Sequence, residues 1–248
     1  MSLRTVHIAS VIVATLLTMI LATLFALSPQ RDLGRSAEAS SCPANQRHLV
    51  PWKGGNWFLS GANVAWQNGG FGADFATVEQ WNQHTYNSAR TDRMFADLKA
   101  AGANSVRWWV FADGRGAPEF RNGQVAGFDA TTLPTMADAI NLAAKHDIYI
   151  TFTLWSFDML ADSPLANRRG LIVDATQRRA LLDNAIVPML RYPVPGTSYM
   201  IGTHPNVISW EVINEPEWGI FEAGAIHASI KQPVTLGEMQ RFIAETAG

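Results

Sequence analysis

Apolar, β-forming runs alternate along the chain with stretches in which apolar residues recur every three or four positions. The β-forming runs are FLSGANVAW (58–66), NSVRWWVF (104–111), IYITFTLW (148–155) and VISWEVIN (207–214). Runs of this length and composition are typical of strands in a sheet that is covered on both faces. The pattern therefore predicts four strands.

Helical periodicity fills the segments that follow these runs. The first helix carries Met94, Phe95 and Leu98 on one face, and Gly102 is a suitable stop. Three further helices are predicted, over 133–144, over 181–190 and from 235 onward. Strand and helix alternate four times, which predicts an α/β fold with a parallel sheet, because each helical crossover returns the chain to begin the next strand in the same direction.

The carboxyl ends of parallel strands share one edge of the sheet, and Glu215 directly follows the fourth run. The segments 67–87, 112–131 and 156–173 follow the other three and are long for simple connections, so we expect a cleft at this edge. Two-residue spacing predicts that Glu215 shares one face of the strand with Glu211. A purely structural role, capping the turn beside Pro216, is the alternative for Glu215.

Arg107 is a charged residue inside an otherwise apolar strand. Burying a guanidinium group requires a carboxylate partner, and Glu211 is the candidate for a structural ion pair. A role of Arg107 in a functional site is the other possibility.

Tryptophan is abundant near the predicted strand ends. Sugar rings present apolar C–H faces that pack on indole. The number of tryptophans near the strand ends therefore favours carbohydrate as the ligand class. The residues concerned are Trp66, Trp81, Trp108, Trp109, Trp155, Trp210 and Trp218. Trp108 and Trp109 must point to opposite faces of their strand, so at most one of them faces a cleft.

Composition and charge narrow the possible partners. The 248 residues are 48% hydrophobic and 16% charged, a composition typical of one globular domain, and the net charge of -2 gives no reason to expect nucleic acid. The six histidines lack metal-ligand spacing and no glycine-rich phosphate loop follows a strand, so we expect no metal and no cofactor.

The N-terminal segment is typical of an exported protein. Arg4 precedes an uncharged apolar stretch at 8–27, and a small-residue region ending in AEAS follows it. We predict a signal peptide or uncleaved membrane anchor over 1–39, a linker over 40–54 and a domain over 55–248. The protein is then secreted or anchored outside the cytoplasm, and it contacts a membrane only if this segment is retained. Cys42 has no partner for an internal disulfide.

The segment WEVINEPEW resembles the fourth-strand motif of glycoside hydrolase family five, within the large clan of retaining (β/α)8 enzymes. SGANVAW and AGANSVRWW are similar to the first and second strands of its mannanases and related cellulases. The resemblance implies a (β/α)8 (TIM) barrel in which Glu215 is the general acid/base. It also implies that Asn214 bonds the sugar 2-hydroxyl and that Arg107 orients the nucleophile.

The resemblance also implies which residues contact a polysaccharide substrate. Asn63 and Trp66 lie in the first-strand segment, and Trp218 closes the fourth. Family-five cellulases often carry histidine near the third-strand tip, whereas LWSFD here places Trp155 and Asp158 there, as on the mannanase side of the family. This favours β-1,4-mannan over β-glucan.

One departure from the family pattern concerns the second carboxylate. The family's nucleophilic glutamate lies on strand seven, and this sequence shows only about four strands. A retaining glycosidase needs two carboxyl groups about 5 to 5.5 Å apart. We therefore expect a truncated half-barrel, the N-terminal part of a longer hydrolase, with its first and fourth strands as open edges and an uncovered apolar interior. Alone it should be inactive and prone to associate.

Two other functions are compatible with the sequence. A membrane-anchored protein could use the tryptophan-lined cleft to bind carbohydrate without cleaving it. An unrelated doubly wound α/β protein would hold a nucleotide at its sheet edge, but the first strand lacks the glycine pattern that binds phosphate.

Overall fold

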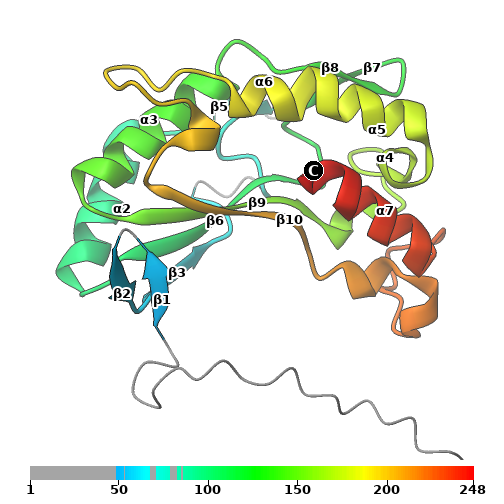
Figure 1. Cartoon of the computed structure of the whole chain (residues 1–248). Coiled ribbons are helices and arrows are strands. Elements are labelled where there is room, and N and C mark those ends of the chain that lie inside the picture. Colours follow the sequence, from blue (N-terminus) through cyan, green and yellow to red (C-terminus); the bar gives the residue numbers. More distant parts are fainter. Residues whose placement is uncertain (1–48, 53, 68–70, 79–82, 85) are drawn as a thin grey trace, which may run out of the picture. The chain divides into compact units, whose positions relative to one another are not determined.

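A computed structural model describes residues 49–52, 54–67, 71–78, 83–84 and 86–248 (Figure 1). These residues form one compact unit, Leu49–Gly248. The predicted N-terminal signal or anchor over 1–39, Cys42 and Trp81 lie outside the described residues. Within the described part, no helix is long and apolar enough to cross a membrane.

The folded unit begins earlier than the sequence predicts. Strands β1 (Val50–Trp52) and β2 (Gly55–Trp57) form an antiparallel hairpin in which Gly54 has a φ of 74°, a conformation that favours glycine. The indole ring of Trp57 meets the ring of Tyr149 edge-on at 5.9 Å. Residues 50–52 of the predicted linker over 40–54 therefore form a strand that pairs with β2.

The central sheet has four parallel strands in the order β10-β9-β6-β3. Their bounds are Gly61–Val64 for β3, Ser105–Ala112 for β6, Tyr149–Ser156 for β9 and Val207–Asn214 for β10. All four predicted strands are present, and the first and fourth lie at the edges as expected. Strand β3 is shorter than predicted, since its pairing with β6 ends at Val64.

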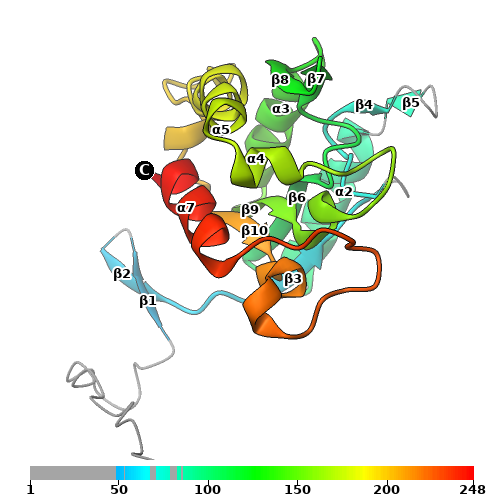
Figure 2. The same cartoon turned by 90° about the vertical axis from the view of Figure 1, so that its right-hand side faces the viewer.

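Helices follow the strands as the periodicity predicts. Helix α2 (Ser88–Ala100) begins where the side chain of Asn87 accepts a hydrogen bond from the Arg90 N–H, and helix α7 (Leu236–Ala247) begins with a capping box between Thr235 and Glu238. Helix α3 is Thr132–Lys145. In Figure 2, seen along the strands, α2, α3, α5 and α7 lie in an arc around one side of the sheet.

The predicted third helix is divided into three parts. Helix α5 (Ala175–Leu181) passes through a π-helical turn, η4 (Leu182–Ile186), into α6 (Val187–Leu190). Pro188 has no N–H to donate to the preceding turn, which explains why the regular hydrogen-bond pattern is interrupted just before it.

The remaining elements are short and lie in the connections. They are β4 (Thr77–Val78), β5 (Gln83–His84), β7 (Glu119–Arg121), β8 (Gln124–Gly127), α4 (Arg169–Val173) and the 3-10 turns η3 (Phe157–Leu160), η5 (Ile201–Thr203), η6 (Pro216–Gly219) and η7 (Phe221–Ala223). Several of them belong to the long loops that the sequence predicts at the carboxyl edge of the sheet.

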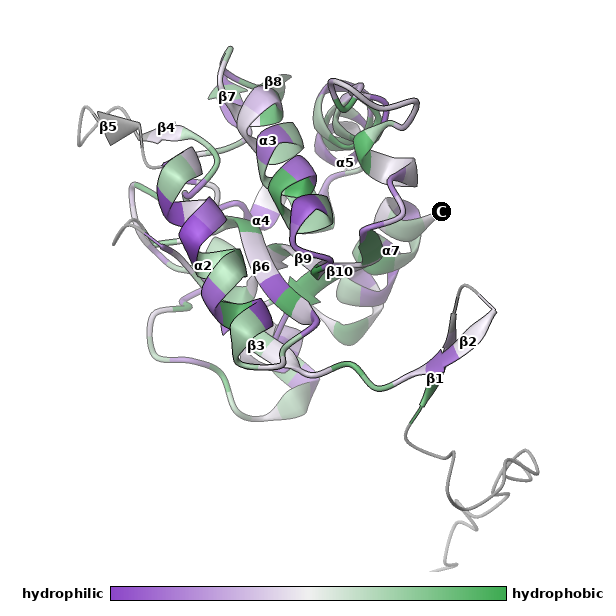
Figure 3. Cartoon of the chain, turned by 90° about the vertical axis from the view of Figure 1, so that its left-hand side faces the viewer, coloured by the Kyte–Doolittle hydropathy of each residue, from purple (hydrophilic) through white to green (hydrophobic). Residues whose placement is uncertain are grey.

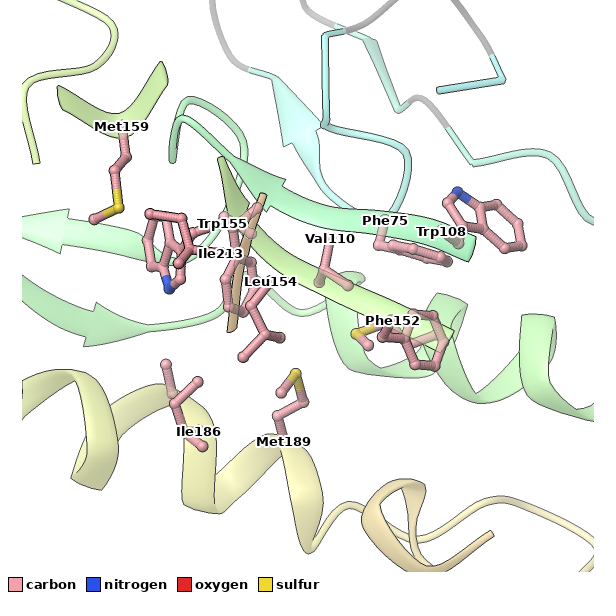
Figure 4. Packing of buried hydrophobic residues seen from close by; sticks show 14 of the residues in the cluster. Phe75, Trp108, Val110, Phe152, Leu154, Trp155, Met159, Ile186, Met189 and Ile213 are labelled. Carbon is pink, nitrogen blue, oxygen red and sulfur yellow. The ribbon is translucent and has the colours of Figure 1, made fainter. Parts of the chain in front are cut away.

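The hydrophobic core lies between the sheet and the helices. Alternate residues of β6 and β9 are buried there, among them Trp108, Phe152 and Leu154. Ile186 and Met189 point from the third helical segment toward Leu154 (Figure 4). Helices α2 and α3 show both hydrophilic and hydrophobic patches in Figure 3, as expected for helices with one face on a core.

The other face of the sheet is more polar than expected. Arg107 and Glu211 are half-buried on it, Ser209 is exposed, and the hydroxyl groups of Ser209 and Thr151 lie 2.7 Å apart. The prediction of an uncovered apolar interior is therefore wrong for much of this face. Here the alternate strand positions are occupied by charged and hydroxyl side chains that bond one another.

Candidate active site

Arg107 occupies the centre of a hydrogen-bond network on the polar face of the sheet. Its Nε donates to Glu211 Oε2 at 2.6 Å and its Nη2 to Glu211 Oε1 at 2.6 Å, which is the two-point geometry that makes an arginine-carboxylate pair directional. The two side chains are 28% and 33% exposed, so the pair is partly shielded from water. The predicted ion pair between Arg107 and Glu211 is confirmed.

All four parallel strands contribute to this network. Arg107 on β6 also donates from Nη1 to Asn63 Oδ1 on β3 at 3.0 Å and from Nη2 to Asn214 Oδ1 on β10 at 2.8 Å. Strand β9, which separates β6 from β10, supplies Thr153, whose hydroxyl donates to Glu211 Oε2 at 3.0 Å. Side chains from four segments far apart in sequence are therefore held in one arrangement.

Asn214 connects the network to Glu215. Because the amide oxygen of Asn214 accepts from Arg107, its NH₂ group is free to donate elsewhere, and it donates to Glu215 Oε2 at 3.0 Å. Regular alternation would place Asn214, three residues beyond Glu211, on the opposite face of the strand. Asn214 nevertheless reaches the same guanidinium group as Glu211.

The backbone of Glu215 leaves the strand conformation. Its φ is 49° and its ψ is 51°, a left-handed conformation that is costly for a residue with a Cβ atom. Pro216 then begins the turn η6. A non-glycine residue in this conformation, with an exposed carboxylate at the carboxyl edge of the sheet, is a feature often found at functional sites.

Aromatic side chains lie on both flanks of the network. On the β3 side, Trp66 is 39% exposed and meets the ring of Trp109 edge-on at 6.1 Å. Trp109 donates from Nε1 to Asn63 Oδ1 at 3.2 Å, and its ring centroid is 5.4 Å from the Arg107 guanidinium carbon. Trp108 is buried instead, so only one of this pair faces the site, as predicted.

On the β10 side, Trp218 is 38% exposed. Its ring centroid lies 6.1 Å from Phe157 and 6.0 Å from His227. Phe157 and His227 carried no sequence signal, because they come from loops that meet only in the folded chain. Two exposed indoles therefore flank the polar network, a suitable arrangement for ligands with both hydroxyl groups and apolar C–H faces.

Asp158 lies near the carboxyl end of β9. Ser156 donates a hydrogen bond to Asp158 Oδ2 at 2.6 Å. Burial raises the pKa of the Asp158 carboxyl, and the neighbouring Asp113 acts in the same direction, against the opposing effects of the Ser156 hydrogen bond and of His227. Asp158 is therefore easier to protonate than an ordinary aspartic acid.

Trp155 does not contact solvent. Its side chain is 0% exposed and its ring lies 5.1 Å from that of Phe111 in the core. The predicted substrate contact by Trp155 is corrected accordingly, since the loops after β6 and β9 cover the indole. Among the described residues, no cluster of His, Cys, Asp and Glu is arranged to hold a metal ion.

Known proteins are similar to this chain in both sequence and fold. No protein-family model matches it. A mannan endo-1,4-beta-mannosidase from Mytilus edulis is 32% identical over 167 residues, which are 67% of this chain and 41% of that protein. The corresponding protein from Cryptopygus antarcticus is 28% identical over 182 residues, 72% of this chain and 43% of that protein. This chain is homologous to endo-β-1,4-mannanases.

Solved structures of mannanases confirm the predicted fold. The β-mannanase from Mytilus edulis superposes with a TM-score of 0.67 at 28% identity, covering 81% of this chain and 57% of that one. The endo-1,4-β-mannanase from Eisenia fetida gives a TM-score of 0.64 at 29% identity, with 81% and 56% covered. The four-stranded parallel sheet thus corresponds to part of a (β/α)8 barrel. The chain spans about two fifths of the length of the curated relatives it matches.

A double-mutant cycle tests the Arg107–Glu211 pair. Replacing either residue alone (Arg107→Met or Glu211→Leu) leaves a half-buried charge without its partner, whereas the double variant removes both charges. We expect a coupling free energy of unfolding of about 1 to 2 kcal/mol, measured by urea denaturation. The exposed pair Arg179–Asp183 is the control and should couple by only about 0.5 kcal/mol. Additive effects at Arg107 and Glu211 would contradict the proposed network.

The stability contributed by Asp158 should depend on pH. A raised pKa in the folded state means that the native protein binds this proton more tightly than the unfolded chain does, so this contribution to stability falls as pH rises from the ordinary aspartate pKa through the folded value. Asp158→Asn keeps an acceptor for Ser156 and removes the titration. Its melting temperature relative to wild type should therefore increase as pH rises above about 4, the ordinary aspartate pKa.

The exposed Asp97 on α2 is a suitable matched control for this comparison. A difference between Asp158→Asn and wild type that stays constant over the whole pH range, or that decreases as pH rises, would show that burial does not raise this pKa.

Proposed function

We propose that this chain contributes the acid/base half of a catalytic site that hydrolyses β-1,4-mannan. The observation that carries the proposal is the chain of contacts from Arg107 through Asn214 to the exposed carboxylate of Glu215, at the carboxyl edge of a partial (β/α)8 barrel. The similarity to mannan endo-1,4-beta-mannosidases supports mannan as the substrate class.

In this proposal Glu215 protonates the glycosidic oxygen and later activates water, as in a retaining mechanism. The NH₂ group of Asn214 already bonds Glu215 and lies beside it, where a sugar hydroxyl could also accept from it. Trp66 and Trp218 would pack against sugar rings on the two sides of Glu215, while Asn63 and Asp158 would supply further polar contacts.

A retaining mechanism requires a second carboxylate. Glu211 is unsuited to this role, because both of its oxygens accept hydrogen bonds from Arg107 and Thr153. We propose that the nucleophile comes from outside the described residues, which agrees with the greater length of the mannanase relatives. On the same basis, the chain would need that complementary part for activity. We further propose that the protein is exported, as expected for an enzyme that acts on an extracellular polysaccharide.

Substitution of Glu215 tests this function in the full protein that contains the chain. Glu215→Gln keeps the size of the side chain and the contact with Asn214 but cannot donate the proton. We expect kcat/KM on linear β-1,4-mannan to fall by about 10² to 10⁴, with a much smaller fall on an aryl β-mannoside whose leaving group needs no proton.

Glu217→Gln is the matched control, since Glu217 is an exposed carboxylate two residues away, and it should keep most of the activity on mannan. Mannan hydrolysis by the Glu215→Gln variant at nearly the wild-type rate would exclude Glu215 as the acid. Wild-type protein that binds mannan without releasing reducing ends would favour a carbohydrate-binding protein instead.

A further inference from the structure

A pocket lies at the same edge of the sheet as Glu215. It has a volume of 680 Å³ and is formed by the segment after β6 and the segment after β9, together with residues near the start of α3. This is the edge turned toward the viewer in Figure 2. Its size is within the range of small-molecule sites and would admit one or two sugar rings.

Three arginines line this pocket, and they differ in how their charges are compensated. Arg115 pairs with the buried Asp113 at 2.6 Å, so its charge is neutralised locally. Arg121 is 78% exposed, and its ion pair with Glu119 is long, at 3.5 Å, so that it is weak and solvated. Arg168 forms no salt bridge with any carboxylate of the described residues.

Arg168 is held in place by neutral groups, and the one carboxylate whose charge acts on it, Asp113, is already paired with Arg115. Its Nη2 donates to the backbone oxygens of Gly114 at 3.2 Å and Leu165 at 3.4 Å, and its guanidinium carbon lies 3.9 Å from the ring centroid of Phe120. Its Nε is buried and has no acceptor among the described residues. A buried N–H donor on a positively charged group calls for an anionic acceptor.

The carboxylates that line the pocket do not fill this need. Asp129 accepts hydrogen bonds from Thr77, Thr131 and Thr132. Burial acts to raise the pKa of Asp129, but these hydrogen bonds outweigh it and hold the pKa well below its usual range. The Asp129 oxygens are therefore bonded to the threonines and not to Arg168. Glu119 is directed to Arg121.

We propose that this pocket binds a sugar that carries a carboxylate, with Arg168 as its principal ligand and Arg121 as a second cation at the rim. A carboxylate matches the fork of a guanidinium group, and the apolar side chains of Pro118, Pro164 and Leu165 offer surface to a ring. The choice of a sugar rests on the proposed function at Glu215, whereas the choice of a carboxylate rests on Arg168 alone.

Binding of sodium D-glucuronate to the full chain, followed by NMR of the arginine side-chain Nε–H groups, tests this site. We expect saturable binding that moves the Arg168 resonance, with the dissociation constant rising about tenfold in Arg168→Met and less in Arg168→Lys, which keeps the charge but not the fork. Arg241→Met, an exposed arginine on α7, is the control and should bind as wild type does.

Two further ligands, one sugar without a carboxylate and one carboxylate without a sugar ring, test the two parts of the proposal separately. Equal binding of D-glucose would overturn the requirement for a carboxylate, and equal binding of sodium acetate would overturn the assignment to a sugar. Unchanged glucuronate binding by both Arg168 variants, with melting curves that show them folded, would overturn the site itself.

The Glu215→Gln variant should bind glucuronate as wild type does, because Glu215 does not line this pocket. Loss of glucuronate binding in that variant would contradict the proposal. A failure of mannan hydrolysis would leave the glucuronate result standing, so the two proposals can fail separately.

Discussion

The ion pair between Arg107 and Glu211 is the interaction on which the arrangement of the site depends. A guanidinium group on the polar face of the sheet needs hydrogen-bond acceptors. Arg107 has them on both edge strands: Asn63 on β3, and Glu211 and Asn214 on β10. The pair spans β9, which adds a further bond from Thr153 to Glu211. One charged side chain thereby connects three strands, in addition to their backbone pairing and to side-chain bonds such as that between Thr151 and Ser209.

The consequence for chemistry is the orientation of Asn214 and Glu215. An amide side chain can turn either way, but a guanidinium neighbour accepts no hydrogen bonds, so Arg107 requires the oxygen of Asn214 and leaves its NH₂ for Glu215. The left-handed backbone at Glu215 and Pro216 behind it end the strand at this point. The sheet therefore positions the carboxylate, while the surrounding loops supply aromatic surface and the pocket at Arg168.

Local patterns explain why much of this could be predicted from the sequence. The four strands, four helical segments and their order follow from periodicity, and a lone arginine in an apolar strand required a carboxylate partner, which Glu211 provides. The orientation of the Asn214 side chain could not be predicted, because it depends on Arg107, more than a hundred residues earlier in the chain. Trp155 is of a residue type that often contacts sugars, but loops cover its side chain, and the packing of these loops cannot be recognised from the local sequence. The pocket at Arg168 likewise joins segments about fifty residues apart.

NMR of the arginine side chains offers the most direct measurement of the central claim. The Nε–H resonance of Arg107, assigned by its loss in Arg107→Lys, should exchange slowly with water and should move in Glu211→Gln, together with the NH₂ resonances of Asn214. If Arg107 instead exchanges as fast as the exposed Arg121 and is unaffected by Glu211→Gln, the ion pair does not organise this site.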